Sequence, residues 1–178
     1  RDWNDLERLA RECGVDGLKR SFAPVVDPGV HLLVLGSLPG EQSLALSRYY
    51  GNPRNQFWRL MSAVTGGDLV PLAYEERLQT LLAARVGLWD TIGAATRQGS
   101  LDGAIKDHRA NDLAALVETL PELRAVAFNG GKSASIGRPA LAKSGVALIP
   151  LPSSSPAFTL AFESKLAEWM KLRAFLEE

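Results

Sequence analysis

Residues 33–58 carry the side chains of this sequence that are best suited to chemistry on an anion or a planar ring. The stretch reads LVLGSLPGEQSLALSRYYGNPRNQFW, in which a glycine-punctuated turn follows an apolar run and precedes two tyrosines, two asparagines and a Phe-Trp pair. A turn that leaves a buried strand and enters a helix exposes backbone N–H groups, which suit anions and the polar edges of rings. We therefore place the candidate site around this turn.

A second polar turn lies at residues 129–133, where the sequence reads NGGKS. This turn is similar to a nucleotide phosphate loop. The spacing of that motif, however, requires its first glycine where this sequence has Val126. No aspartate on a following strand is available to hold magnesium. A nucleoside triphosphatase is therefore excluded. Asn129 and Lys132 remain candidate site residues because they follow an apolar run directly.

A third turn, at residues 152–156, places three consecutive serines between two prolines. The serines can act as a nucleophile site, yet no histidine stands near them in sequence and no nucleophile-elbow pattern surrounds them. They can form a solvated turn, or they can present hydroxyl and amide groups to phosphate oxygens. The residues alone leave the last two alternatives open.

The apolar pattern predicts the elements that position these turns. Short apolar runs predict strands over residues 30–35, 86–92, 124–128 and 146–149. Helical spacing predicts helices over residues 2–12, 41–47, 55–64 (capped by Asn55), 73–84, 113–120, from the 129–131 turn to 141, and 158–176. Residues 97–111 are polar and show no pattern, and Asn111 or Asp112 caps the helix that begins at residue 113.

Strands separated by helical segments of about ten residues or more form parallel βαβ units. We expect one domain over residues 1–178, folded as a three-layer α/β/α sandwich around a central, mainly parallel four-stranded sheet. The carboxyl ends of parallel strands face one edge, so the turns at 36–40, 129–132 and 152–156 should meet there and form a crevice for a ligand.

Composition limits the functional classes. Twenty basic and 20 acidic residues give a formal net charge of zero, which argues against a broad basic face for nucleic acid but allows a few phosphate contacts. One cysteine, Cys13, cannot make an internal disulfide, and His31 and His108 stand too far apart for a metal motif, so we expect no metal and no cofactor. Without a long apolar run or a signal-peptide pattern, we expect a cytoplasmic protein without a membrane span.

Taken together, the runs GSLPGEQSL and YYGNPRNQFW resemble the uracil-DNA glycosylase superfamily, and most closely its hypoxanthine (deoxyinosine) branch. Weaker agreement continues through LWDTI, SLDGAI, AFNGGKSA and LPSSSPAF, in the family's order, from residue 30 to about residue 158. The resemblance implies an α/β/α fold, extrusion of a base from DNA and cleavage of the N-glycosidic bond without a metal.

Two positions depart from related patterns. In the mismatch-specific branch the first turn is similar to GINPG, whose asparagine positions the attacking water, and uracil-specific enzymes carry an aspartate there. Here that position is Leu38, which cannot orient water. The family's tyrosine-rich run usually reads Tyr-Tyr-x-His-Pro-x-Asn, and this chain has Asn52 in place of the histidine, so a proton donor is replaced by a neutral amide.

The resemblance implies a role for each candidate residue. Asn55 would direct the attacking water through its amide oxygen, and Asn129, the second catalytic amide, would hydrogen-bond the extruded base or help to place the water. The base would contact Gly36, Ser37, Leu38, Pro39, Gly40, Tyr49, Tyr50 and Asn52. One of the two tyrosines should line the crevice and stack on the base, a contact worth about 1–3 kcal/mol. Flanking phosphates would contact Ser43, Lys132, Pro152, Ser153, Ser154, Ser155 and Pro156.

The resulting hypothesis is a monomeric, monofunctional glycosylase for deaminated bases, acting on double-stranded DNA that contains a damaged or mismatched base. No lysine lies in the first turn, so no Schiff-base step is expected. The alternative is a non-catalytic α/β module that binds nucleotides or DNA, and a small serine hydrolase is a third possibility.

Overall fold

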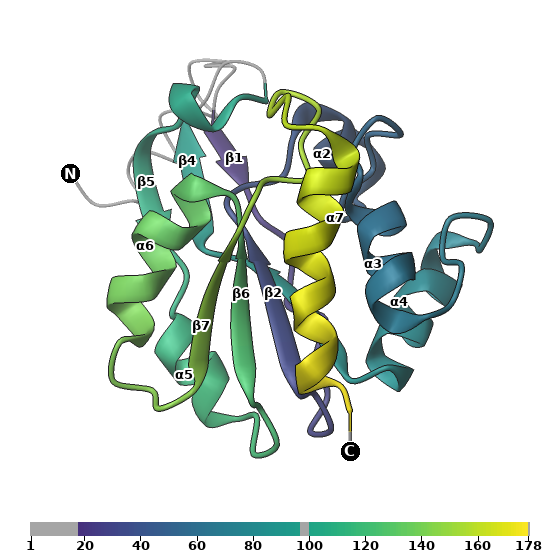
Figure 1. The fold of residues 1–178 in the computed structure, drawn as a ribbon. Helices are drawn as coiled ribbons and strands as arrows, with labels where there is room; N and C mark the ends of the chain where they lie inside the picture. The colour runs from purple at the N-terminus through teal and green to yellow at the C-terminus, as the bar shows by residue number, and fades with distance from the viewer. Residues whose placement is uncertain (1–17, 97–99, 178) are drawn as a thin grey trace.

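A four-stranded parallel sheet forms the centre of the structure, a computed structural model that describes residues 18–96 and 100–177 (Figure 1). Its strands are β2 (Leu32–Gly36), β3 (Val86–Asp90), β6 (Ala125–Asn129) and β7 (Ala147–Leu151), in the order β3-β2-β6-β7. Every residue of β2 and β6 is buried, as expected for unbroken apolar runs covered on both faces. The predicted parallel sheet is confirmed.

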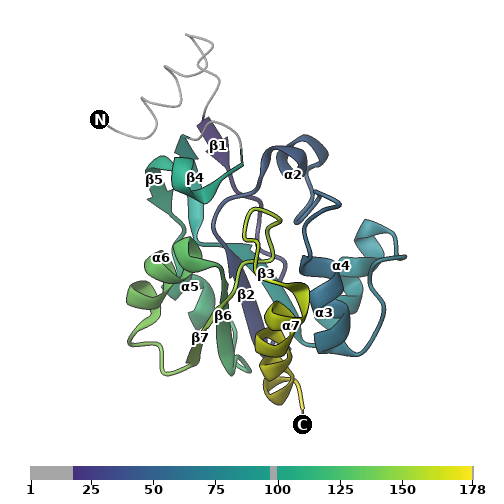
Figure 2. The same ribbon diagram turned by 45° about the horizontal axis from the view of Figure 1, so that its top comes forward.

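Helices cover both faces of this sheet (Figures 1 and 2). On one face lie α5 (Leu113–Glu118) and α6 (Gly131–Leu141), and on the other lie α3 (Phe57–Thr65) and α7 (Phe162–Met170), with α4 (Tyr74–Ala83) beside α3. Because side chains alternate along a strand, Leu33 packs in the first layer with Leu113 and Leu141, whereas Leu32 packs in the second with Phe57 and Trp169. These three layers match the predicted sandwich.

A second, antiparallel sheet was not expected from the sequence. It consists of β1 (Leu18–Arg20), β4 (Ile92–Thr96) and β5 (Lys106–Ala110), in the order β1-β4-β5. The prediction of one strand over residues 86–92 is wrong, because the chain leaves the parallel sheet after β3 and continues into β4. Residues 97–111 show no apolar pattern, yet the described part of this segment forms a short 3₁₀ helix, η1 (Asp102–Ala104), and β5.

Several predicted bounds also change. The last helix, α7, begins at Phe162 rather than at residue 158, because the segment after the serine turn is an exposed loop. It continues as a 3₁₀ helix, η2 (Lys171–Phe175). Helix α2 (Glu41–Leu46) lies where it was expected, and β7 ends two residues later than expected. The predicted helix over residues 2–12 lies outside the described residues. No described helix is long and apolar enough to span a membrane.

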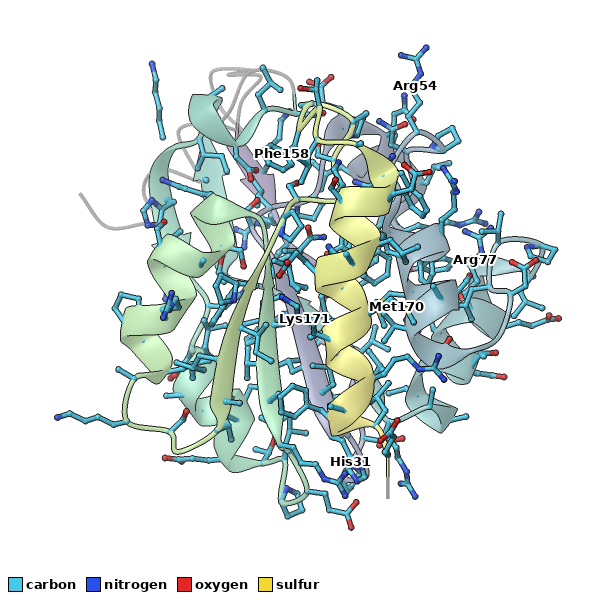
Figure 3. All side chains as sticks on the ribbon, viewed as in Figure 1. His31, Arg54, Arg77, Phe158, Met170 and Lys171 are labelled. Atoms are coloured by element: carbon cyan, nitrogen blue, oxygen red, sulfur yellow. The ribbon has the colours of Figure 1, made fainter. Side chains whose placement is uncertain are left out.

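Figure 3 identifies the two ends of the parallel sheet. His31, directly before β2, lies at the lower end in this view, 3.8 Å from the Glu122 carboxylate. Phe158 lies at the upper end, on the loop that follows β7. The carboxyl ends of the four parallel strands point to this upper end, so the turns that follow β2, β6 and β7 meet there, as predicted.

Helix α6 packs so closely on the sheet that it needs a glycine. A Cβ added to Gly137 would lie 2.2 Å from Cε1 of the buried Phe128 ring. We therefore expect Gly137→Ala to lower the free energy of unfolding by about 1–3 kcal/mol through overpacking. Urea unfolding measures this, with Gly131→Ala in the same helix as control, since a Cβ there meets nothing within 4 Å. Equal stabilities of the two variants would contradict the close packing.

Candidate active site

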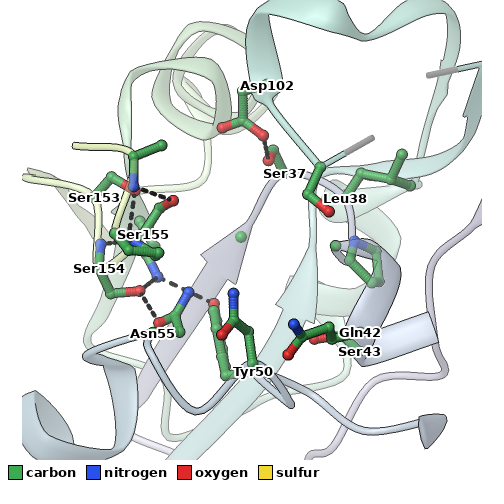
Figure 4. A pocket seen from close by; sticks show the side chains of 18 of the residues that line it. Ser37, Leu38, Gln42, Ser43, Tyr50, Asn55, Asp102, Ser153, Ser154 and Ser155 are labelled. Atoms are coloured by element: carbon green, nitrogen blue, oxygen red, sulfur yellow. Dashed lines mark hydrogen bonds between the residues drawn. The ribbon is translucent and has the colours of Figure 1, made fainter. Parts of the chain in front are cut away.

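A cavity of about 490 Å³ opens at the carboxyl edge of the parallel sheet (Figure 4). Its walls are the turn after β2, the segment at residues 49–55, the end of β3, residues 100–102, the end of β6 and the loop after β7. Predicted site residues that line it are Gly36, Ser37, Leu38, Pro39, Gly40, Ser43, Tyr49, Tyr50, Asn52, Asn55, Asn129, Ser153, Ser154, Ser155 and Pro156. Lys132 and Pro152 do not line it.

Three polar side chains form a hydrogen-bonded chain across one wall of this cavity. Ser154 Oγ lies 2.7 Å from Asn55 Oδ1 and 2.9 Å from Asn129 Nδ2. The Ser154 backbone N–H donates to Asn129 Oδ1 over 2.9 Å. One serine thus connects the end of β6, the loop after β7 and the segment that leads into α3.

Backbone donors fix the direction of every bond in this chain. The Phe57 N–H donates to Asn55 Oδ1 over 3.0 Å, and because a backbone N–H can only donate, this atom must be the amide oxygen. The Ser154 N–H fixes Asn129 Oδ1 in the same way. Asn129 Nδ2 therefore donates to Ser154 Oγ, whose own proton goes to Asn55 Oδ1. The prediction that Asn55 caps the helix is wrong: α3 begins at Phe57, its N-cap is Gln56, and Asn55 Oδ1 accepts from the Phe57 N–H one position before the cap.

This arrangement determines which atoms of Asn55 face a ligand. Its oxygen accepts two hydrogen bonds, from Phe57 N–H and from Ser154 Oγ–H. Within the described chain, Nδ2 of Asn55 has no hydrogen-bond partner. The group that Asn55 offers to the cavity is thus the amide NH₂, whereas the sequence interpretation assigned the amide oxygen to the water.

Of the two adjacent tyrosines, Tyr50 presents its hydroxyl to the site. Tyr50 Oη accepts from Asn129 Nδ2 over 3.2 Å, so its own proton is available to donate elsewhere. Its ring stacks on Phe57, with centroids 3.8 Å apart and planes at 16°. Burial, and then the Asp90 carboxylate, raise the pKa of Tyr50, so the hydroxyl stays protonated at neutral pH.

Tyr49 belongs mainly to the core. It is 4% exposed, and its hydroxyl donates to the carbonyl oxygen of Ala23 over 2.7 Å. Its ring meets Phe22 edge-on. Of the two tyrosines, Tyr50 is therefore the one whose hydroxyl belongs to the site, while its ring stacks on Phe57.

The turn after β2 meets the cavity chiefly through its backbone. Leu38 packs with Ile92 and Ile105 in a small apolar cluster beneath the antiparallel sheet. Ser37 Oγ donates to Asp102 Oδ1 over 2.6 Å. A Cβ on Gly36 would lie 2.6 Å from Asp90 Oδ1, so only glycine lets the turn approach this closely.

Asp90 and Asp102 line the cavity but were not among the predicted site residues. Asp90 ends β3 at the same edge as the other turns, so a correct end for that strand would have revealed it. Asp102 lies in the segment without apolar pattern, and no signal in the sequence marks it. Among the described residues, no three His, Cys, Asp or Glu side chains form a group that could hold a metal ion.

The remaining predicted residues mostly support loops. Ser43 is buried, and its hydroxyl accepts from Gly51 N–H over 2.9 Å. The Asn52 side chain accepts from Arg54 N–H over 2.9 Å. The carbonyl oxygen of Pro152 accepts from Trp169 Nε1 over 2.9 Å.

A buried lysine holds the serine turn in place from α7. Lys165 is 1% exposed, and its Nζ donates to the carbonyl oxygen of Ser155 over 3.2 Å and lies 5.4 Å from the Phe158 ring centroid. Burial lowers the pKa of Lys165. Through the bond to Ser155, Lys165 holds the base of a loop in which the Phe158 side chain is 45% exposed.

Comparisons with known proteins agree with this geometry. Residues 23–177 match the family model of the Uracil DNA glycosylase superfamily. The chain is similar to two proteins named hypoxanthine DNA glycosylase. The first, from Methanosarcina acetivorans, is 42% identical over 152 residues, which are 85% of this chain and 96% of the relative. The second, from Methanosarcina barkeri, is 40% identical over 151 residues, 85% of this chain and 95% of the relative.

A solved structure is also similar throughout. It is the solution NMR structure of a protein proposed to be a uracil DNA glycosylase from Methanosarcina acetivorans. The two structures superpose with a TM-score of 0.82 at 41% sequence identity, covering 90% of this chain and 99% of the other.

The buried Tyr49 hydroxyl predicts a change in stability at high pH. Burial, and then the Asp90 carboxylate, raise its pKa above the ordinary value of 10.0, so the unfolded chain loses this proton first as pH rises. The contribution of Tyr49 to stability is complete below pH 10 and falls by about 1 kcal/mol between pH 10 and 11. Between pH 10 and 11, urea unfolding should show a smaller decrease in the free energy of unfolding for Tyr49→Phe than for the parent. From pH 7 to 9, the difference in the free energy of unfolding between the two proteins should stay constant. Parallel curves up to pH 11 would contradict the raised pKa.

Proposed function

The chain belongs to the uracil-DNA glycosylase superfamily, and from that premise we propose that it is a monofunctional DNA glycosylase that excises a deaminated base. Hypoxanthine and uracil are the proposed bases, with mismatched thymine as a further substrate. The observation that carries the proposal is the convergence of Asn55, Asn129, Ser154 and Tyr50 on one cavity at the carboxyl edge of the sheet. A volume of about 490 Å³ lies in the range of small-ligand sites.

A base in this cavity must first leave the double helix, because its glycosidic bond is not accessible within the stack. Extrusion costs a few kcal/mol and costs least for mispaired or damaged bases. In the proposal, the backbone of residues 36–40 contacts the edge of the extruded base, and the exposed Phe158 loop occupies the space that it leaves.

Tyr50 is proposed to assist the departing base. As the bond between C1′ and the base nitrogen breaks, the bonding electrons stay on the base, and its carbonyl oxygen gains negative charge. A preorganised donor at that oxygen stabilises the transition state. Tyr50 can serve as this donor because Asn129 occupies its acceptor side and its raised pKa keeps the proton in place.

Asn55 is proposed to position the attacking water through its NH₂ group. Since its oxygen is already hydrogen-bonded, Nδ2 can donate to one lone pair of the water while the other lone pair faces C1′. The oxocarbenium-like sugar is electrophilic enough for neutral water to attack, so no strong base is needed. The new C1′–O bond forms and the attacking water loses a proton to solvent, while the departed base, which kept the bonding electrons, takes up a proton from solvent.

The composition of the cavity wall supports hydrolysis without a covalent intermediate. None of the described residues that line the cavity is a lysine or a histidine. A lysine would be required for a Schiff base, and a histidine would be the usual partner of a serine nucleophile. We propose that the protein acts as a monomer on double-stranded DNA, in the cytoplasm.

A gel assay tests the proposed function directly. Duplexes with a single hypoxanthine, uracil, xanthine or mismatched thymine are incubated with the protein and then treated with alkali. Alkali-dependent strand breaks at one or more of these bases are expected. Binding without strand breaks on any duplex would favour the non-catalytic alternative, which the names of the relatives do not favour.

Asn55→Ala should reduce the single-turnover rate of excision about 10²–10⁴-fold, since it removes the group that positions the nucleophile. Affinity for the duplex should change little, because base and phosphate contacts remain. Single-turnover kinetics with excess enzyme and a gel-shift titration measure the two quantities. Excision at the parent's rate would remove Asn55 from the mechanism.

Ser154→Ala tests whether the serine orients the two asparagines. The variant leaves Asn55 Oδ1 and Asn129 Nδ2 each with one hydrogen bond fewer. We expect the excision rate to fall about 10–100-fold, equivalent to about 1.4–2.8 kcal/mol, with little change in affinity. Ser135→Ala, an exposed serine on α6 outside the cavity, is the control. Equal rates for both variants would show that the hydrogen-bonded chain is dispensable.

A further inference from the structure

A second cavity, of about 400 Å³, lies on the other side of the segment at residues 49–55. It shares Tyr49, Tyr50, Asn52 and Asn55 with the first cavity, and its remaining walls come from Leu46, Arg48, α3, α4 and residues 70–73. We propose that this second cavity, here called the arginine cleft, binds backbone phosphates of the DNA strand that carries the extruded nucleotide. This inference rests on the proposed function and adds a binding site to it.

The charge of the cleft favours an anion. Three guanidinium groups line it, from Arg48, Arg59 and Arg77, and no acidic side chain does. None of the three arginines makes an ion pair with any residue of the described ranges, 18–96 and 100–177. In a chain of zero net charge, this is a local excess of positive charge beside the candidate site.

Aromatic rings and backbone carbonyls hold the guanidinium groups in place. Arg77 Nε donates to the carbonyl oxygen of Leu72 over 3.0 Å, Nη2 donates to that of Val70, and the group lies 5.2 Å from the Trp58 ring centroid. Arg48 lies 5.3 Å from the centroid of Tyr74.

Arg59 completes the set, 4.1 Å from the centroid of Phe162 on α7. A guanidinium that lies over a ring keeps N–H donors at its edge for other partners, and its planar fork matches phosphate oxygens. The three arginines are thus partly ordered before a ligand arrives, which lowers the entropic cost of binding.

The position of the cleft matches the path of a DNA strand. A nucleotide held in the first cavity must connect to its neighbours across the rim, and the segment at residues 49–55 forms that rim toward α3 and α4. Arg54, on the same segment, extends from the upper end of the molecule, and Arg77 lies below it on the α4 side (Figure 3). Phosphates of the connecting strand would therefore meet the arginine cleft first on this side.

The salt dependence of DNA binding tests the proposal. Each phosphate contact contributes about −0.9 to the slope of log K against log salt concentration, and about five- to tenfold to affinity near 0.1 M salt. Arg48→Ala and Arg59→Ala should each lower the magnitude of the slope by about 0.9 and weaken binding to any duplex by about five- to tenfold, and the double variant should lower the slope by about 1.8. Excision at saturating enzyme should stay within about twofold of the parent's rate, because the reacting groups are untouched.

Arg138→Ala, an exposed arginine on α6 across the sheet, is the matched control and should leave the slope unchanged. Arg77 is not used, since its substitution would also release residues 70–72. Slopes and affinities equal to the parent's, in a protein that still excises a base, would overturn the arginine cleft alone. No excision of any base by the parent protein would overturn the proposed function instead.

A titration with inorganic phosphate separates a second occupant. If phosphate binds the parent protein and not the double variant, while the DNA slopes are unchanged, the cleft is a site for a small free anion and the proposal is wrong. If the slopes fall as expected, the DNA backbone is its ligand.

Discussion

The hydroxyl and amide of Ser154 organise the candidate site, because they connect three segments that lie far apart in sequence. Its N–H and Oγ bind the Asn129 amide at the end of β6, and its Oγ binds Asn55, 99 positions earlier in the chain. The backbone N–H groups of Ser154 and Phe57 leave each amide one possible orientation. The chemistry that Asn55 and Tyr50 can perform follows from this one set of hydrogen bonds.

The parallel sheet makes that set possible. Strands β6 and β7 are adjacent and parallel, with Asn129 paired to Leu151, so the residues that follow them begin side by side at one edge. The segment before α3 joins them through Gln56 N–H, which donates to the carbonyl oxygen of Ser154 over 3.0 Å. Lys165 holds the same turn from below through the next carbonyl. Secondary structure thus places the loops of the site, and hydrogen-bond donors from neighbouring elements hold them.

The parts of this arrangement that depend on apolar pattern could be predicted from the sequence. The runs that became β2 and β6 are buried on both faces, and the turns after them fall where parallel strands must end. The antiparallel sheet could not be predicted, because β5 reads KDHRA and exposes most of its side chains, leaving no alternation to detect. The orientation of the Asn55 amide was also beyond the sequence, since it depends on a contact with Ser154 made only in the folded chain.

The segment at residues 49–55 shows why the candidate site and the arginine cleft should be considered together. Tyr50 has a φ of 53°, in the left-handed region that costs a non-glycine residue about 1–2 kcal/mol. Stacking on Phe57, the bond from Asn129 and the donation of Trp58 Nε1 to the Tyr50 carbonyl oxygen over 3.2 Å offset that cost. The same Trp58 ring lies beneath Arg77 in the cleft. One strained residue is therefore held by groups that line both cavities, with Asn129 on one side and Trp58 on the other.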